Sequence, residues 1–288
     1  LSLFIWHLPL QWFWNDDCDT MMKAAAKMMK AAVIQAAGTG PVFGEFQAPS
    51  PTSERIVVQV LASAITHLSK MRGSGAHYSS DAVFPSVPGV DGVGVAPDGR
   101  RVFFMLPDAP FGALAEESLV DPRLCIPVPD GLDDVSAAAL ANPGMSAFTS
   151  LAERAKIQKG ETVLINGATG TAGSTAVQVA KFLGAGKILV SGRSAAKLES
   201  LRALGADEII PFTIDAEHPD GAAAFERSLA PHIRKLDVVI DYLWGKSASA
   251  IISSVARNVE DGHRVRFVQV GSASGQATID LSAASLRS

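Results

Sequence analysis

Cysteine is scarce in this chain, and neither sign of charge dominates it. Only two of the 288 residues are cysteines, Cys18 and Cys125, which excludes a disulfide framework and indicates a reducing compartment such as the cytoplasm. The formal net charge is −4, so no basic surplus indicates binding to nucleic acid or to an anionic membrane. We therefore expect a cytoplasmic protein whose partner is a small-molecule substrate.

Long hydrophobic runs are also missing. The N-terminal stretch "LSLFIWHLPLQWFW" has about 14 mostly apolar residues, too few for a membrane-spanning helix. It lacks the basic segment that begins a secretory signal. We expect residues 1–28 to lie outside the fold; an amphipathic anchor is the alternative, although the only nearby charges are acidic. What the chain does have is 48% hydrophobic and 19% charged residues, enough to bury sizeable cores.

The first half of the chain alternates short strands with turns. Runs rich in β-branched residues and bounded by Pro, Gly and Asp are typical of strands. Strands are expected within 30–35, 54–63, 88–106, 111–122 and 124–131, with a Pro-Asp-Gly turn at 97–99. A helix is predicted over 134–141, with Asp133 or Asp134 near its cap.

From about Thr149 the pattern changes to strands that alternate with helices. Strands are predicted at 162–166, 187–191, 207–212, 236–241 and 266–271. Helices are predicted at 171–183, between Ser194 and Gly205, at 220–233 and at 246–258. Continuous apolar strands separated by helices indicate a doubly wound parallel sheet covered on both faces, so the fold class is α/β.

A glycine-rich loop joins the first of these strands to its helix. The loop "GATGTAG" consists of Gly167, Ala168, Thr169, Gly170, Thr171, Ala172 and Gly173. Glycines at such spacing permit a tight turn, let the backbone approach a pyrophosphate and let the helix pack on the strand. The strand–loop–helix context therefore predicts dinucleotide binding, with a purely structural turn as the alternative.

The end of the second strand selects the cofactor. An NAD site needs Asp or Glu there to hold the ribose 2′-hydroxyl, and the first acid is Glu199. The residues that stand there instead are Ser191, Gly192, Arg193, Ser194 and Lys197. Arg193 is placed to pair with a 2′-phosphate, Ser191 or Ser194 can donate hydrogen bonds to it, and Lys197 adds charge. We predict NADPH; the alternative for Arg193 is a solvated surface arginine.

Several motifs resemble one family. They are "MKAAVIQ", "PGVDGVG", "ANPGMSAFTSL", "GETVLINGATGTAGSTAVQVAKFLGA", "RALGADEII" and "DVVIDYLWG". Together they resemble the medium-chain dehydrogenase/reductase (MDR) superfamily, and most closely its zinc-free quinone oxidoreductase-like branch. The resemblance runs from Met29 to Ser288 and implies a GroES-like catalytic domain (29–145), a Rossmann domain (146–276) and NADPH in the cleft between them.

Zinc ligands are missing from the positions that the resemblance assigns to them. Zinc members carry Cys-His and His-Glu where this chain has Thr66-His67 and Val90-Asp91. A catalytic zinc needs three protein ligands, so we expect no metal.

Candidate catalytic groups follow from the same resemblance. In the branch, an Asn usually stands at position 66 and a Tyr near Tyr78, so Thr66, Tyr78 and His77 are candidates on the substrate side; a loop tyrosine that holds its own backbone is the alternative for Tyr78. Three further positions are expected beside the cofactor: Ser146, Tyr242 and Gly271. Trp244 can stack on a flat ring or pack under its loop.

The implied activity is hydride transfer from NADPH to a quinone or an α,β-unsaturated carbonyl. An alcohol or aldehyde reductase of the same fold and a non-catalytic NADPH-binding protein remain open. Family members continue past "IDLSAASLRS", so the resemblance implies a truncated C-terminus, with residues 277–288 starting a return segment. It also implies a homodimer for the complete form.

Overall fold

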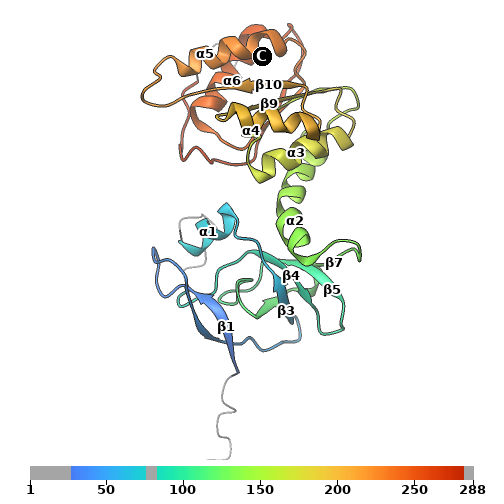
Figure 1. The fold of residues 1–288 in the computed structure, drawn as a ribbon, viewed down its shortest axis with the longest axis vertical. Helices are drawn as coiled ribbons and strands as arrows, with labels where there is room; N and C mark the ends of the chain where they lie inside the picture. Colours follow the sequence, from blue (N-terminus) through green and yellow to red (C-terminus); the bar gives the residue numbers. More distant parts are fainter. Residues whose placement is uncertain (1–26, 76–82, 282–288) are drawn as a thin grey trace, which may run out of the picture. The chain divides into compact units, whose positions relative to one another are not determined.

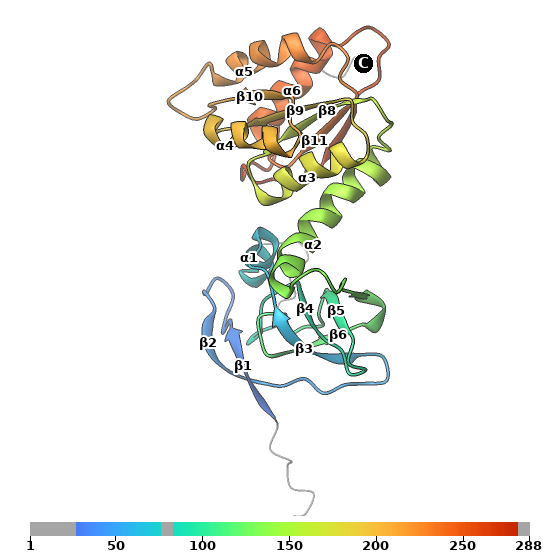
Figure 2. The same cartoon turned by 45° about the vertical axis from the view of Figure 1, so that its right-hand side comes forward.

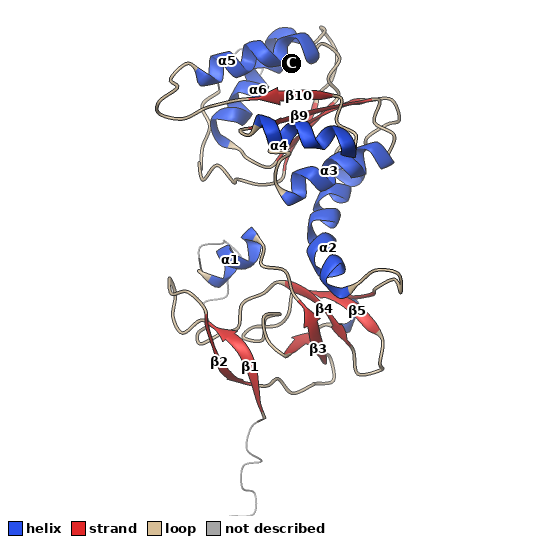
Figure 3. Ribbon diagram, viewed as in Figure 1, coloured by secondary structure: helices blue, strands red, loops and turns tan. Residues whose placement is uncertain are grey.

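The computed structural model describes residues 27–75 and 83–281. The chain divides into two compact units, Leu1–Val135 and Ser136–Ser288. The first consists mainly of strands, whereas strands and helices alternate in the second (Figure 3). The predicted succession of a β-rich part and an α/β part is therefore confirmed.

The first unit is built around an antiparallel five-stranded sheet of order β6-β3-β4-β5-β7. Its strands are β3 (Ile56–Ala62), β4 (Asp91–Val95), β5 (Arg101–Met105), β6 (Glu117–Val120) and β7 (Cys125–Pro127). A separate hairpin pairs β1 (Met28–Val33) with β2 (Val42–Gln47), as Figure 1 shows. The sequence did not predict β2, because Pro41 and Gly44 interrupt its pattern, nor the short helix α1 (His67–Gly73).

Helix α2 (Asp134–Phe148) contains the predicted helix but is longer. The prediction stopped before Pro143, because proline removes a backbone hydrogen bond from a helix interior. Here Pro143 lies inside the helix, and the chain continues as a π-helix over Thr149–Arg154.

The second unit has a parallel five-stranded sheet of order β10-β9-β8-β11-β12. Its strands are β8 (Thr162–Asn166), β9 (Lys187–Gly192), β10 (Glu208–Pro211), β11 (Val238–Asp241) and β12 (Arg266–Gln269). Its helices are α3 (Thr171–Phe182), α4 (Ala195–Ser200), α5 (Gly221–Leu229) and α6 (Gly245–Asn258), with short 3-10 turns at Leu201–Leu204 and Ala230–His232.

Helices cover both faces of this sheet (Figure 2). On one face, α3 and α4 bury Ala176, Val177 and Leu198 against the strands. On the other, α5 and α6 bury Phe225 and Ile251. The predicted doubly wound sheet is confirmed. Because β8 and β11 are neighbours whose following helices lie on opposite faces, their carboxyl ends form the switch point where such sheets bind ligands.

Candidate active site

The three glycines of the loop after β8 differ in backbone conformation and in the space around them. Gly167 has φ +84°, which glycine adopts without steric cost. A Cβ on Gly173 would lie 2.4 Å from the Gly167 carbonyl oxygen, so α3 packs tightly on the loop only because that side chain is missing. A Cβ on Gly170 would meet nothing nearer than that same oxygen, at 3.8 Å. The fold has room for a side chain at position 170. A ligand that approaches the backbone there would lose that room to a side chain, so glycine suits ligand binding.

Gly170 also forms the N-cap of α3. No side chain caps this helix, and its first residues Thr171 and Ala172 carry no acidic group. The free N–H groups and the positive end of the helix dipole therefore point toward the loop, which suits a phosphate. The loop and the helix fit the pyrophosphate of a dinucleotide.

The end of β9 lies against this loop. A Cβ on Gly192 would be 3.4 Å from Cγ2 of Thr169. Beyond it, Arg193 and Lys197 are exposed, and neither side chain forms an ion pair with another residue in the described part of the chain. The Ser194 hydroxyl accepts a hydrogen bond from the Lys197 backbone N–H at 3.4 Å and caps α4. Two exposed cations and a hydroxyl therefore directly follow the strand end that contacts the loop.

Ser191 has a different position from the one expected of a phosphate donor. Its side chain is fully buried, and its hydroxyl donates to Oδ1 of Asn166 at 2.8 Å. A ligand on the surface cannot take that hydrogen bond without displacing it. Ser191 supports the loop from inside, whereas the Ser194 hydroxyl accepts the cap hydrogen bond and can still donate its own hydrogen to a ligand.

Ser146, Tyr242 and Gly271 lie together at the carboxyl end of β11. Tyr242 is 9% exposed, and its hydroxyl has no hydrogen bond of standard geometry with any described residue. Burial raises the pKa of Tyr242 to about 12, and the nearby Ser146 hydroxyl opposes this shift. A Cβ on Gly271 would lie 2.9 Å from the Tyr242 carbonyl oxygen. The structure thus brings these three expected positions to one point.

A buried polar cluster beneath the site was missed by the sequence analysis. Asn166 donates from Nδ2 to Oδ1 of Asp241 at 2.8 Å and to the Ser247 hydroxyl at 3.0 Å. Burial raises the pKa of Asp241, while its hydrogen bonds from Leu243, Asn166 and Trp244 lower it. The sequence did contain a signal for this cluster, because the apolar strands β8 and β11 each end in a polar residue, Asn166 and Asp241.

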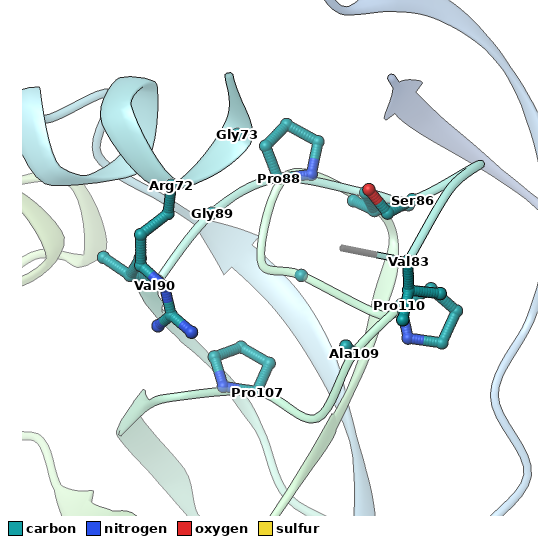
Figure 4. Close-up of a pocket in the computed structure, with 12 residues that line it drawn as sticks. Arg72, Gly73, Val83, Ser86, Pro88, Gly89, Val90, Pro107, Ala109 and Pro110 are labelled. Atoms are coloured by element: carbon teal, nitrogen blue, oxygen red, sulfur yellow. The ribbon is translucent and has the colours of Figure 1, made fainter. Parts of the chain in front are cut away.

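The substrate-side candidates belong to the first unit. Thr66 is the N-cap of α1, and its hydroxyl accepts from the Ser69 backbone N–H at 3.0 Å. His77 and Tyr78 lie outside the described residues. The chain on either side of them reaches one small cavity of about 70 Å³, which Gly73 and Val83 help to line. The Arg72 side chain lies beside Pro107 and Val90 there (Figure 4).

No three His, Cys, Asp or Glu side chains gather into a metal-binding group within the described ranges. Position 66 is the helix cap, and Asp91 is buried at the start of β4. Across those same ranges, no helix is both long and apolar enough to cross a membrane.

Known proteins resemble the chain in sequence and in fold. No protein-family model matches it. A probable NADPH-dependent quinone reductase of Emericella nidulans is 28% identical over 80% of this chain and 72% of its own length. A 2-methylene-furan-3-one reductase of Solanum lycopersicum is 31% identical, over 57% of this chain and 46% of its own length. The chain thus spans less than half of the second relative.

Solved structures with a similar fold include quinone oxidoreductases as well. The quinone oxidoreductase of Thermus thermophilus, studied also in complex with NADPH, superposes with a TM-score of 0.68 at 26% identity, covering 84% of this chain and 79% of the other. A Pseudomonas syringae quinone oxidoreductase gives 0.71 at 26% identity, covering 88% and 75%.

A GroES-like β unit followed by a Rossmann unit with this glycine loop defines the medium-chain dehydrogenase/reductase class. Within that superfamily, the chain is similar in sequence and in fold to quinone oxidoreductase-like members.

Proposed function

We propose that the protein is an NADPH-dependent, zinc-independent reductase that delivers hydride to a quinone or an α,β-unsaturated carbonyl. One observation supports this most directly: Gly170 leaves an open approach to the α3 N-terminus, and the strand end that contacts this loop is followed by the exposed Arg193 and Lys197. The names of two relatives reported above, a probable NADPH-dependent quinone reductase and a 2-methylene-furan-3-one reductase, support this reaction class.

The second unit supplies the cofactor contacts. Backbone N–H groups of residues 167–173 bind the pyrophosphate, and the α3 dipole adds to the attraction. Arg193 pairs with the 2′-phosphate, with Ser194 and Lys197 beside it. Ser146, Tyr242 and Gly271 border the nicotinamide side. When bound, NADPH supplies the hydride.

The first unit supplies the substrate side. Reduction of a conjugated carbonyl places negative charge on oxygen, and hydrogen-bond donors stabilise it where no metal does. By the resemblance, Tyr78 is the candidate donor to that oxygen, and His77 and the Thr66 hydroxyl are the other candidate polar groups. A neutral phenol suits this role, because it can also give up a proton once the charge has formed.

A panel assay tests this proposal. NADPH oxidation is followed with quinones, enones and aldehydes, and NADPH binding is measured separately by calorimetry. We expect turnover of quinones or enones, faster with NADPH than with NADH, and a loss of turnover with retained NADPH binding in Tyr78→Phe. Binding without turnover of any class supports a non-catalytic protein instead, and failure to bind NADPH contradicts the proposal altogether.

We also infer that the protein acts in the cytoplasm as a homodimer. The scarcity of cysteine supports the first inference. The resemblance supports the second, as does the position of β12 at one end of the sheet formed by the described residues. Light scattering of the purified chain measures the oligomeric state, and a monomer at all concentrations contradicts the dimer.

A further inference from the structure

Trp244 holds a backbone conformation that belongs to glycine. Its φ is 62° and its ψ −166°, a region that side-chain-bearing residues rarely occupy because Cβ meets the backbone. Such a conformation persists only where the surroundings impose it, and it clusters at ligand sites. A tryptophan in this conformation therefore needs contacts that hold its backbone, and its large side chain needs a role that glycine could not fill.

The restraint is the carboxylate of Asp241. Its Oδ2 accepts the Trp244 backbone N–H at 3.0 Å, and its Oδ1 accepts that of Leu243 at 3.1 Å. On the other side of the strained residue, the Ser247 hydroxyl donates to the Trp244 carbonyl oxygen at 3.3 Å. Both peptide groups of Trp244 are thus held by buried side chains.

The same carboxylate is tied to the cofactor loop. Asn166, the last residue of β8 before the glycines, donates to Asp241 at 2.8 Å and accepts from Ser191 at 2.8 Å. Asn166, Asp241 and Ser191 have no exposed surface, and Ser247 is 6% exposed. The ends of three neighbouring strands and the start of α6 are therefore locked to the turn that carries Trp244.

The reason for tryptophan is its ring. The indole is half-buried, and its Nε1–H donates to the Ala277 carbonyl oxygen at 3.3 Å, which fixes the orientation of the ring. Trp244 follows β11 at the edge of the sheet where such folds bind ligands. A large, oriented aromatic surface at that place suits another flat, conjugated ring.

We propose that Trp244 determines specificity by contacting a flat conjugated ring, and that Asp241 is the positioning residue that holds it. The ring belongs to the nicotinamide or to the substrate, which share this chemistry. The inference rests on the proposed function for the ligand, but the restraint on Trp244 is a property of the free protein and is tested without any ligand.

The strain is tested by two substitutions at one position. Trp244→Ala removes the indole but keeps a Cβ, whereas Trp244→Gly removes both. We expect the Gly variant to melt about 2–4 °C above the Ala variant. The matched control is Gln178, exposed within α3, where Gly must melt below Ala, as in ordinary helices. The same order at both positions overturns the strained conformation.

The positioning role is tested by a double-mutant cycle. Asp241→Asn keeps the size of the side chain but leaves one carbonyl oxygen for hydrogen bonds that two carboxylate oxygens accept. We expect it to lower the melting temperature more in the wild-type background than beside Trp244→Gly, because glycine needs no restraint. Equal losses in both backgrounds overturn the role of Asp241.

The ligand is tested by fluorescence and kinetics on the full chain. Replacing Trp6, Trp12 and Trp14 with Phe leaves Trp244 as the sole tryptophan. If the nicotinamide is the ring, NADPH quenches this emission more than its fragment 2′-phospho-ADP-ribose does. If the substrate is the ring, Trp244→Ala raises the quinone KM about three- to tenfold and leaves kcat nearly unchanged.

Either result supports the proposal. Calorimetric NADPH binding with neither quenching nor a change in KM overturns the role of Trp244 and leaves the proposed function intact. Absence of NADPH binding overturns the proposed function, while the Ala and Gly comparison still reports on the restraint.

Discussion

At the scale of single residues, Arg193 carries the choice of cofactor. It is exposed at the end of β9, so its guanidinium can meet a 2′-phosphate without losing another partner. We expect Arg193→Ala to weaken NADPH binding about tenfold to a hundredfold, the range for a charge-assisted hydrogen bond, and to leave NADH binding nearly unchanged. Titration calorimetry with both cofactors measures this. Arg227→Ala, an exposed arginine of α5, is the control, and an equal loss in both variants contradicts the assignment.

Tyr242 predicts a pH dependence of stability. Burial raises its pKa from 10.0 to about 12, so the folded chain keeps a proton that the unfolded chain releases. Below pH 10 both states are protonated and nothing changes. As the pH rises from about 10 to about 12, the free energy of unfolding falls by up to about 2.7 kcal/mol. Denaturant titrations should show this loss in the wild type and not in Tyr242→Phe. Parallel pH profiles for the two proteins contradict it.

At the scale of elements, two glycines of the β8–α3 turn have different roles: Gly173 is required by the fold, and Gly170 is required by a ligand. A Cβ on Gly173 collides with backbone, whereas a Cβ on Gly170 meets nothing within 3.4 Å. We expect Gly173→Ala to lower the free energy of unfolding by about 1–3 kcal/mol, as overpacking does. Gly170→Ala should leave stability nearly unchanged and weaken NADPH binding at least tenfold. Binding and chemical denaturation of both variants check this; equal NADPH affinity in Gly170→Ala and the wild type contradicts a cofactor at this loop.

The same elements show what could be predicted from sequence. Strands β8 to β12 and their helices were predicted because apolar runs, caps and glycines agree there. Helix α2 was predicted too short because a proline usually ends a helix, whereas the buried Pro143 lies inside this one. The cluster of Asn166, Asp241 and Ser247 was missed because residues far apart in sequence create it. The strain at Trp244 was also missed, because backbone angles forced by hydrogen bonds leave no trace in composition.

At the scale of the whole molecule, the described groups that we assign to the cofactor all come from one of the two compact units. The glycine loop, Arg193 and Tyr242 lie within Ser136–Ser288. A ligand that binds only a folded unit stabilises that unit, by about 2.7 kcal/mol at a hundredfold excess over Kd. We therefore expect calorimetry to resolve two unfolding transitions, of which NADPH raises one by several degrees.

The emission of Trp244, alone after the other three tryptophans are replaced, identifies the shifted transition, because this residue belongs to the same unit. The 2′-phospho-ADP-ribose fragment should shift the same transition, since the loop and Arg193 hold the phosphates. A quinone added without cofactor should raise the midpoint of either transition less than NADPH raises the midpoint of the shifted one. If NADPH instead raises both transitions equally, the cofactor contacts both units with similar strength. The assignment of its binding energy to the Rossmann unit is then wrong.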